Sequence, residues 1–251
     1  PVGYNLGQSG NTPSQNLVDA YEMIDGTPFD WNNPEHKSNP YANRDPRLAM
    51  SILTNNVEFK DRTIEAWTGG RDGKGVIHAT RTGYYIYKFI DPNLDLLQNR
   101  TSVHHWVIMR YAEILLSYAE AMNEAYGPTG NVGYRLNAVR ALNQVRNRVG
   151  VEMPAVPTAI SKEELREKIR NERRVELAFE DHRFWDVRRW MIAPETLGTP
   201  LRGVEITKIS DEEFEYKPIE VEKRTFEPKM YLYPIPQADL NTTGWVQNPL
   251  W

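Results

Sequence analysis

The stretch that most constrains this chain is residues 161–190, SKEELREKIRNERRVELAFEDHRFWDVRRW, which contains neither glycine nor proline. Ser161 followed three residues later by Glu164 is a capping-box pattern, and it predicts a helix N-terminus here. Apolar residues then recur on one face of a helical wheel, namely Leu165, Ile169, Phe179, Val187 and Trp190. We therefore expect one long helix that buries this face.

Charged residues share the apolar face of this predicted helix. Burying a carboxylate or a guanidinium is costly unless a partner of opposite charge accompanies it. We therefore predict a structural ion-pair network that contains Glu172, Arg173, Glu176 and Arg183. The alternative is that Glu172 and Glu176 act as a catalytic acid and base, which requires different environments for the two carboxylates. The neighbouring arginines favour keeping both ionised, so the structural interpretation is preferred.

The run IRNERRVELAFEDHRFWDVRRW resembles the signature helix of the SusD/RagB family, surface lipoproteins that Bacteroidota pair with TonB-dependent transporters. The usual family form has Gly and Leu where this chain has Asp181 and Val187. Three further segments resemble the family in the same order along the chain: NPYANRDPRLAMSIL, RYAEILLSYAEAMNE and the ending with PIP and QNP. The match therefore extends over most of the sequence.

The resemblance implies a mainly α fold, a SusD-like α-α superhelix with a tetratricopeptide-like helical hairpin, extended irregular loops and minor β-hairpins. It also implies that residues 1–251 are the C-terminal part of a longer SusD-like domain. The expected parts are a loop-rich region (1–102), the hairpin (103–150), the signature helix (151–192) and an irregular C-terminal region (193–251).

Hydrophobic periodicity predicts the helical hairpin without the resemblance. Residues 107–126 place apolar side chains on one face and Arg110, Glu113, Glu120 and Glu124 on the other, and Gly127-Pro128 follows. A second apolar stripe runs from Ala138 to Val149 and stops at Gly150. Two helices joined by a short connection are expected to pack against each other.

Composition excludes several classes of function. The net charge of -4 gives no nucleic-acid footprint. The absence of cysteine excludes disulfide and thiolate chemistry. Asp91, Asn93 and Asp95 begin like a calcium loop, but Leu96 and Ser102 stand where its turn glycine and bidentate glutamate belong. We therefore expect neither a metal nor another cofactor.

Two loop regions hold the candidate ligand contacts. Trp31, Asn32 and Asn33 lie in the first, and Trp67, Arg71 and Asp72 lie in the second, which is rich in glycine. Tryptophan faces stack on sugar rings, and amide, carboxylate and guanidinium groups bond to sugar hydroxyls. These six residues are therefore our glycan-binding candidates. The alternative is that the loop tryptophans fold back against a core edge.

The resemblance implies a non-catalytic function at the cell surface. The expected ligand is a glycan or another oligomeric nutrient, which the protein delivers to a SusC-like TonB-dependent transporter. The expected location is the outer membrane, held by a lipid anchor that this chain does not contain. Two alternatives remain open from the residues alone: a helical-repeat scaffold that binds peptides, and a glycosidase that uses two carboxylates.

Overall fold

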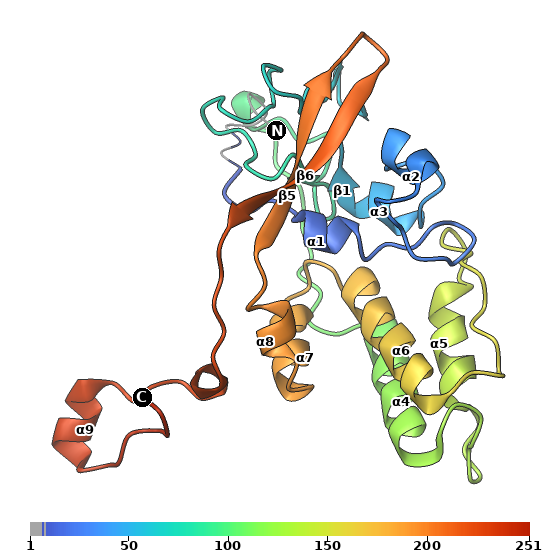
Figure 1. Cartoon of the computed structure of the whole chain (residues 1–251), viewed down its shortest axis with the longest axis vertical. Coiled ribbons are helices and arrows are strands. Elements are labelled where there is room, and N and C mark those ends of the chain that lie inside the picture. Colours follow the sequence, from blue (N-terminus) through green and yellow to red (C-terminus); the bar gives the residue numbers. More distant parts are fainter. Residues whose placement is uncertain (1–6, 8) are drawn as a thin grey trace.

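The structure is a computed structural model that describes residue 7 and residues 9–251 (Figure 1). Short helices and two-residue strands occupy the first hundred residues, longer helices follow, and one β-hairpin precedes the tail. The elements are α1 (Gln15–Val18), α2 (Pro34–Ser38), α3 (Arg47–Ser51), β1 (Ile52–Leu53), β2 (Glu58–Phe59), β3 (Arg62–Thr63), β4 (Tyr85–Ile86), η1 (Leu96–Gln98), α4 (Tyr111–Tyr126), α5 (Ala138–Arg146), α6 (Lys162–Glu176), α7 (His182–Arg189), α8 (Ala193–Thr196), β5 (Leu201–Lys208), β6 (Phe214–Glu222), η2 (Pro228–Tyr231) and α9 (Gln237–Thr243).

The helical hairpin predicted from periodicity is present as α4 and α5. Gly127, with φ of 75°, ends α4, and the side chain of Asn137 caps the start of α5. Both helices pack with α6 around one buried cluster that includes Leu116, Leu142 and Leu165. The first helix begins at Tyr111 and not at residue 107, because residues 103–110 form no helix and residues 103–109 are exposed.

The prediction of one long helix over residues 161–190 is wrong, because the structure divides this stretch into α6 and α7. The capping box of Ser161 and Glu164 forms as expected, but the helix ends at Glu176. Phe179 and Asp181 then adopt left-handed backbone conformations, with φ of 64° and 62°, which no α-helix tolerates. Asp181 stands where the usual family form has glycine, the residue that adopts this conformation most readily.

A second buried cluster lies around the β5–β6 hairpin and the loops of the first hundred residues. Val204, Ile206 and Tyr216 face this cluster from the hairpin, in which Ile206 pairs with Tyr216. Tyr21, Ile52, Ile64 and Tyr84 contribute from α1, β1 and the loops. One of the expected minor β-hairpins is therefore present here, and it carries part of the core for the N-terminal loops.

Residues 227–251 form a tail that contains η2 and α9 and leads away from α4, α5 and α6 (Figure 1). The tail closes on itself through Gln247, whose side chain accepts from the Ile235 amide at 2.8 Å and donates to its carbonyl at 2.9 Å. The PIP and QNP motifs therefore meet as a clasp. In the described part of the chain, no helix combines the length and the apolar character needed to cross a bilayer.

Candidate functional site

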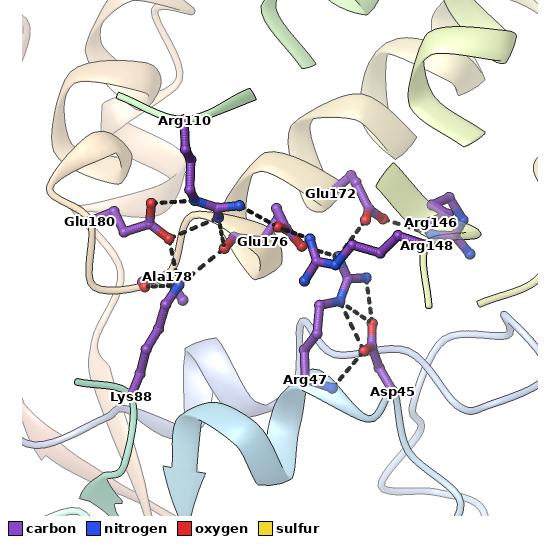
Figure 2. A network of polar contacts seen from close by, with 10 residues as sticks. All are labelled: Asp45, Arg47, Lys88, Arg110, Arg146, Arg148, Glu172, Glu176, Ala178 and Glu180. Atoms are coloured by element: carbon purple, nitrogen blue, oxygen red, sulfur yellow. Dashed lines mark hydrogen bonds and ion pairs between the residues drawn. The ribbon is translucent and has the colours of Figure 1, made fainter. Parts of the chain in front are cut away.

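A buried ion-pair network joins the N-terminal loops to α6 (Figure 2). Arg47, at the start of α3, contacts the carboxylates of Asp45 at 2.6 Å, Glu172 at 2.5 Å and Glu176 at 2.9 Å. Arg146 bonds to the second oxygen of Glu172 at 2.8 Å. Each of these side chains is at most 4% exposed. Such burial stabilises the fold only while every charge keeps its partner.

The same network continues to the turn between α6 and α7 (Figure 2). Arg110, directly before α4, bonds to Glu176 at 2.6 Å and to Glu180 at 2.7 Å, and Arg148 also contacts Glu176. Lys88 pairs with Glu180 at 2.5 Å and donates to the Ala178 carbonyl at 3.0 Å. These charges fix the non-helical turn against the extended segment before α4.

Only two of the four residues predicted for the ion-pair network lie in it. Glu172 and Glu176 lie in the network, whereas Arg173 forms a separate buried pair with Asp186 of α7 at 2.9 Å. Within residues 9–251, Arg183 forms no ion pair. The prediction that Arg183 belongs to the network is therefore wrong. Its physical reason is the turn at Phe179 and Asp181, which gives α7 a different face from the one that a continuous helix would present.

The geometry of Glu176 argues against an acid/base role. Both of its carboxylate oxygens are occupied, Oε1 by Arg110 and Arg148 and Oε2 by Arg47. Desolvation by burial acts to raise the pKa of Glu176, but hydrogen bonds from these arginines outweigh it and lower the pKa to about 2. A catalytic acid needs the opposite shift. Glu176 is therefore an ionised partner of three arginines at neutral pH.

The first loop of candidate contacts folds back toward the core. The Trp31 indole N–H donates to Asp19 at 3.0 Å, and its half-buried ring packs edge-on against Phe29. Asn33 accepts from the Glu35 amide and so caps α2. Asn32 is exposed and donates to Asp30. Trp31 and Asn33 therefore position the loop and α2.

The second loop is likewise held by its own contacts. Trp67 is half-buried and packs against Phe214 of β6, with ring centroids 5.4 Å apart. Arg71 is exposed and pairs with Glu65 at 3.3 Å. Asp72 is completely buried and binds Arg62 through both oxygens, at 2.5 and 2.8 Å. The prediction that Asp72 contacts a ligand is wrong, because its carboxylate is fully buried and both of its oxygens bind Arg62.

Both loops support the walls of one groove of about 900 Å³ between α2 and β6. Asn33 caps α2, which forms one wall, and Trp67 packs behind Phe214, which belongs to the other. Residues 54–57 complete the lining. The side chains with polar or aromatic groups are Lys37, Ser38, Asn39, Tyr41, Thr54, Asn55, Asn56, Glu212, Glu213, Phe214, Glu215 and Tyr216.

Two tyrosines of the groove stay protonated at neutral pH. Burial raises the pKa of Tyr41 and of Tyr216, and the nearby amide of Asn55 opposes this effect at Tyr216. Their hydroxyls therefore remain neutral hydrogen-bonding groups, and that of Tyr41 already donates to the Tyr84 hydroxyl at 3.3 Å. The lining also contains the amides of Asn39 and Asn56. Neutral donors and acceptors beside aromatic rings match the surface of a polyhydroxylated ligand.

The groove residues include aromatic side chains that the sequence analysis did not identify. Phe214 and Tyr216 are two residues apart on a strand, so their side chains lie on the same face. The alternation of aromatic and polar residues at positions 214–216 was the sequence signal that could have identified Phe214 and Tyr216. Tyr41 gave none, because it lies in an irregular segment, and its contact with Tyr216 at a centroid distance of 5.3 Å depends on the tertiary fold. Among the described residues, no group of three acidic or histidine side chains could hold a metal.

Comparison with known proteins gives consistent results. The sequence model of the SusD family matches residues 2–251. The SusD-like protein P2 of Formosa agariphila is 34% identical over 120 residues, which are 46% of this chain and 22% of that protein.

Two solved structures from Bacteroides fragilis are similar over nearly the whole chain. A SusD-like protein has a TM-score of 0.80 and 34% identity, with 98% of this chain and 48% of that chain covered. A SusD-like carbohydrate-binding protein has a TM-score of 0.70 and 31% identity, with 91% and 47% covered. These structures confirm the predicted mainly helical, SusD-like fold. This chain spans about half the length of both.

Proposed function

The chain belongs to the SusD family, and from this premise we propose that it binds a glycan, without catalysis, in the groove between α2 and β6. One observation supports this site above others: two loops far apart in sequence hold the opposite walls of the same groove. Asn33 caps the wall of α2, and Trp67 supports Phe214 on the wall of β6. A solved relative is described as carbohydrate-binding, which favours the same class of ligand.

The proposed ligand contacts are the groove side chains that solvent reaches. Asn39 and Lys37 are exposed on α2 or directly after it, and Phe214 is half-buried on β6. A sugar ring between the walls would place its C–H face against Phe214 and its hydroxyls toward the amide and ammonium groups. Trp31 and Trp67 were expected from the sequence to contact the ligand. In this proposal they do not touch it, and they position the groove walls instead.

We further propose that the protein acts at the outer membrane and passes its ligand to a SusC-like TonB-dependent transporter. Family membership supports this proposal. Co-purification from outer membranes with an affinity tag on this protein tests it. A TonB-dependent transporter recovered in equal amount is the expected result, and recovery of the protein alone after mild detergent extraction would contradict it.

A glycosidase function is less favoured by the geometry. Glu172 and Glu176 are each 2% exposed, and arginines hold the carboxylates of both. A retaining or inverting glycosidase needs one carboxyl group able to donate a proton to the substrate. The lowered pKa of Glu176 is unsuited to that role.

A binding comparison of two matched variants tests the groove. The first combines Lys37→Ala with Asn39→Ala, which removes two exposed groups from one wall. The second is Asn32→Ala, an exposed amide in the preceding loop that does not line the groove. We expect affinity electrophoresis on a glycan panel to show roughly tenfold weaker binding for the double variant, as for the loss of one or two hydrogen bonds.

The control variant should bind like the unmodified protein. Equal binding by all three proteins would contradict the groove assignment. Weakening by Asn32→Ala alone would return the site to the loop that contains Trp31.

A further inference from the structure

A second cavity, of about 460 Å³, lies between α4 and α7, apart from the groove. Its lining combines an aromatic ring with many polar groups: Glu113, Ser117, Glu120, Ala121, Glu124, Arg173, His182, Trp185, Asp186 and Arg189. The cavity shares no residue with the groove between α2 and β6. It also shares no side chain with the Arg47 network, so neither site explains its composition.

Trp185 is the aromatic residue of this cavity, and it is largely exposed. Its side chain is 60% exposed, although it belongs to a helix and not to a flexible loop. Phe184 contacts its ring edge-on, with centroids 5.1 Å apart. Leaving this much indole surface in water is unfavourable, and a face of this kind on a rigid element is suited to stacking.

Most charges around Trp185 are already paired. Arg189 binds Glu120 at 2.5 Å and Asp186 at 2.9 Å, and Arg173 also binds Asp186. Glu124 is paired with Arg166 at 2.6 Å. These pairs therefore leave little capacity for a charged ligand.

Glu113 and His182 are the exception. Their closest nitrogen and oxygen atoms are 3.7 Å apart, which is too long for a hydrogen bond. His182 is three residues before Trp185, so both lie on the same face of α7. Beside the exposed indole there is thus one carboxylate and one imidazole with unused hydrogen-bonding capacity.

We propose that this cavity is a second glycan subsite, which takes an uncharged pyranose ring. The ring stacks on Trp185, and one of its hydroxyls lies between Glu113 and His182, donating to the carboxylate. Among the described residues, Glu113 has no cationic partner closer than His182 at 3.7 Å, so its carboxylate repels a uronate or a sulfated sugar at the same position. The proposal does not depend on the groove, because the two cavities use different elements.

The test compares Trp185→Ala with Trp245→Ala, a matched loss of an indole that is 63% exposed in the tail. Both variants are prepared with and without Lys37→Ala and Asn39→Ala in the groove. The probes are cellohexaose, maltohexaose and the hexamer of galacturonic acid, measured by isothermal titration. Thermal unfolding of each variant checks that the fold is retained.

We expect Trp185→Ala to weaken binding of at least one neutral hexamer roughly tenfold, whether or not the groove is intact, and Trp245→Ala to leave it unchanged. We also expect Glu113→Gln to reduce the discrimination against the galacturonic acid hexamer. Equal affinities of Trp185→Ala and the unmodified protein for both neutral hexamers would overturn the proposal. If Trp185→Ala weakens binding but Lys37→Ala with Asn39→Ala does not, only the proposed groove site is overturned.

Discussion

At the scale of single residues, the charges that organise this protein are buried arginines. Arg47 touches three carboxylates and is 4% exposed. Arg44 is also buried, and it donates to the carbonyls of Val18, Tyr21 and Pro40. Arg44 thus bonds directly to irregular backbone, whereas Arg47 binds the carboxylate of Asp45 in the same segment. Guanidinium groups therefore add to the backbone hydrogen bonds that hold the N-terminal loops.

Replacing Arg47 with alanine should lower the free energy of unfolding by roughly 3–5 kcal/mol, because the carboxylates of Asp45, Glu172 and Glu176 lose a buried partner. Arg183→Ala is the matched comparison, since Arg183 forms no ion pair within the described chain. Urea unfolding of both variants measures the difference. An equal loss for Arg183→Ala would show that the network is not what stabilises this junction.

Glu176 should make stability depend on acidity. Its pKa is lowered from 4.5 to about 2 in the folded protein, so the unfolded chain takes up the proton first as the pH falls. The stabilisation is therefore complete above the unfolded pKa and is lost between about pH 4.5 and 2, with a total of about 3 kcal/mol.

The variant Glu176→Gln removes this titrating group. Urea unfolding at a series of pH values should give a smaller acid-induced loss of stability than in the unmodified protein. An identical pH dependence in the two proteins would mean that other groups carry the effect.

The sequence predicted the carboxylates that α6 contributes to the network, but not the arginines that bind them. The burial of Glu172 and Glu176 follows from their place on the apolar face of a helix. Their partners Arg47 and Arg110 could not be predicted, because they come from segments more than sixty residues away. Arg183 was wrongly assigned to the network because the sequence has no glycine or proline that would indicate the turn before α7.

At the scale of elements, α7 holds the start of the tail through Arg188. Its guanidinium donates to the carbonyls of Met230 at 2.7 Å and Tyr231 at 2.5 Å. Aromatic rings surround it, with centroids 5.0 to 5.9 Å away, namely Phe184, Phe226, Tyr231 and Tyr233. A planar cation that stacks and donates at once is a role that lysine cannot fill.

Arg188→Lys should therefore release the tail while leaving the helical cluster folded. Chymotrypsin digestion followed by mass spectrometry should show faster cleavage at residues 231–233 than in the unmodified protein. Arg140→Ala, which removes an exposed arginine of α5, is the control and should not change the cleavage rate. Unchanged protection in Arg188→Lys would mean that the Gln247 clasp alone protects these bonds.

The elements were predictable where a local pattern specified them. Apolar periodicity and the glycine after Tyr126 were sufficient for the α4–α5 hairpin. The break at Phe179 and Asp181 was not predictable from propensity, because contacts of Glu180 with Lys88 and Arg110 hold this turn. Tertiary ion pairs override helical preference there.

At the scale of the whole molecule, two buried clusters meet at the Arg47 network. One contains the α4–α5 hairpin and α6, and the other contains the β5–β6 hairpin with the N-terminal loops. The proposed glycan groove belongs to the second cluster, and its lining comes from residues 34–42, 54–57 and 209–216. Sequence reasoning placed the function in the loops, but only the fold shows which loop residues line a groove and which support it.

The most direct test of the proposed function is hydrogen–deuterium exchange of the protein with and without a glycan that it retains in affinity electrophoresis. We expect slower exchange on ligand addition in residues 34–42, 54–57 and 209–216 together, because these segments line one groove. Protection confined to other segments, with these three unchanged, would contradict it.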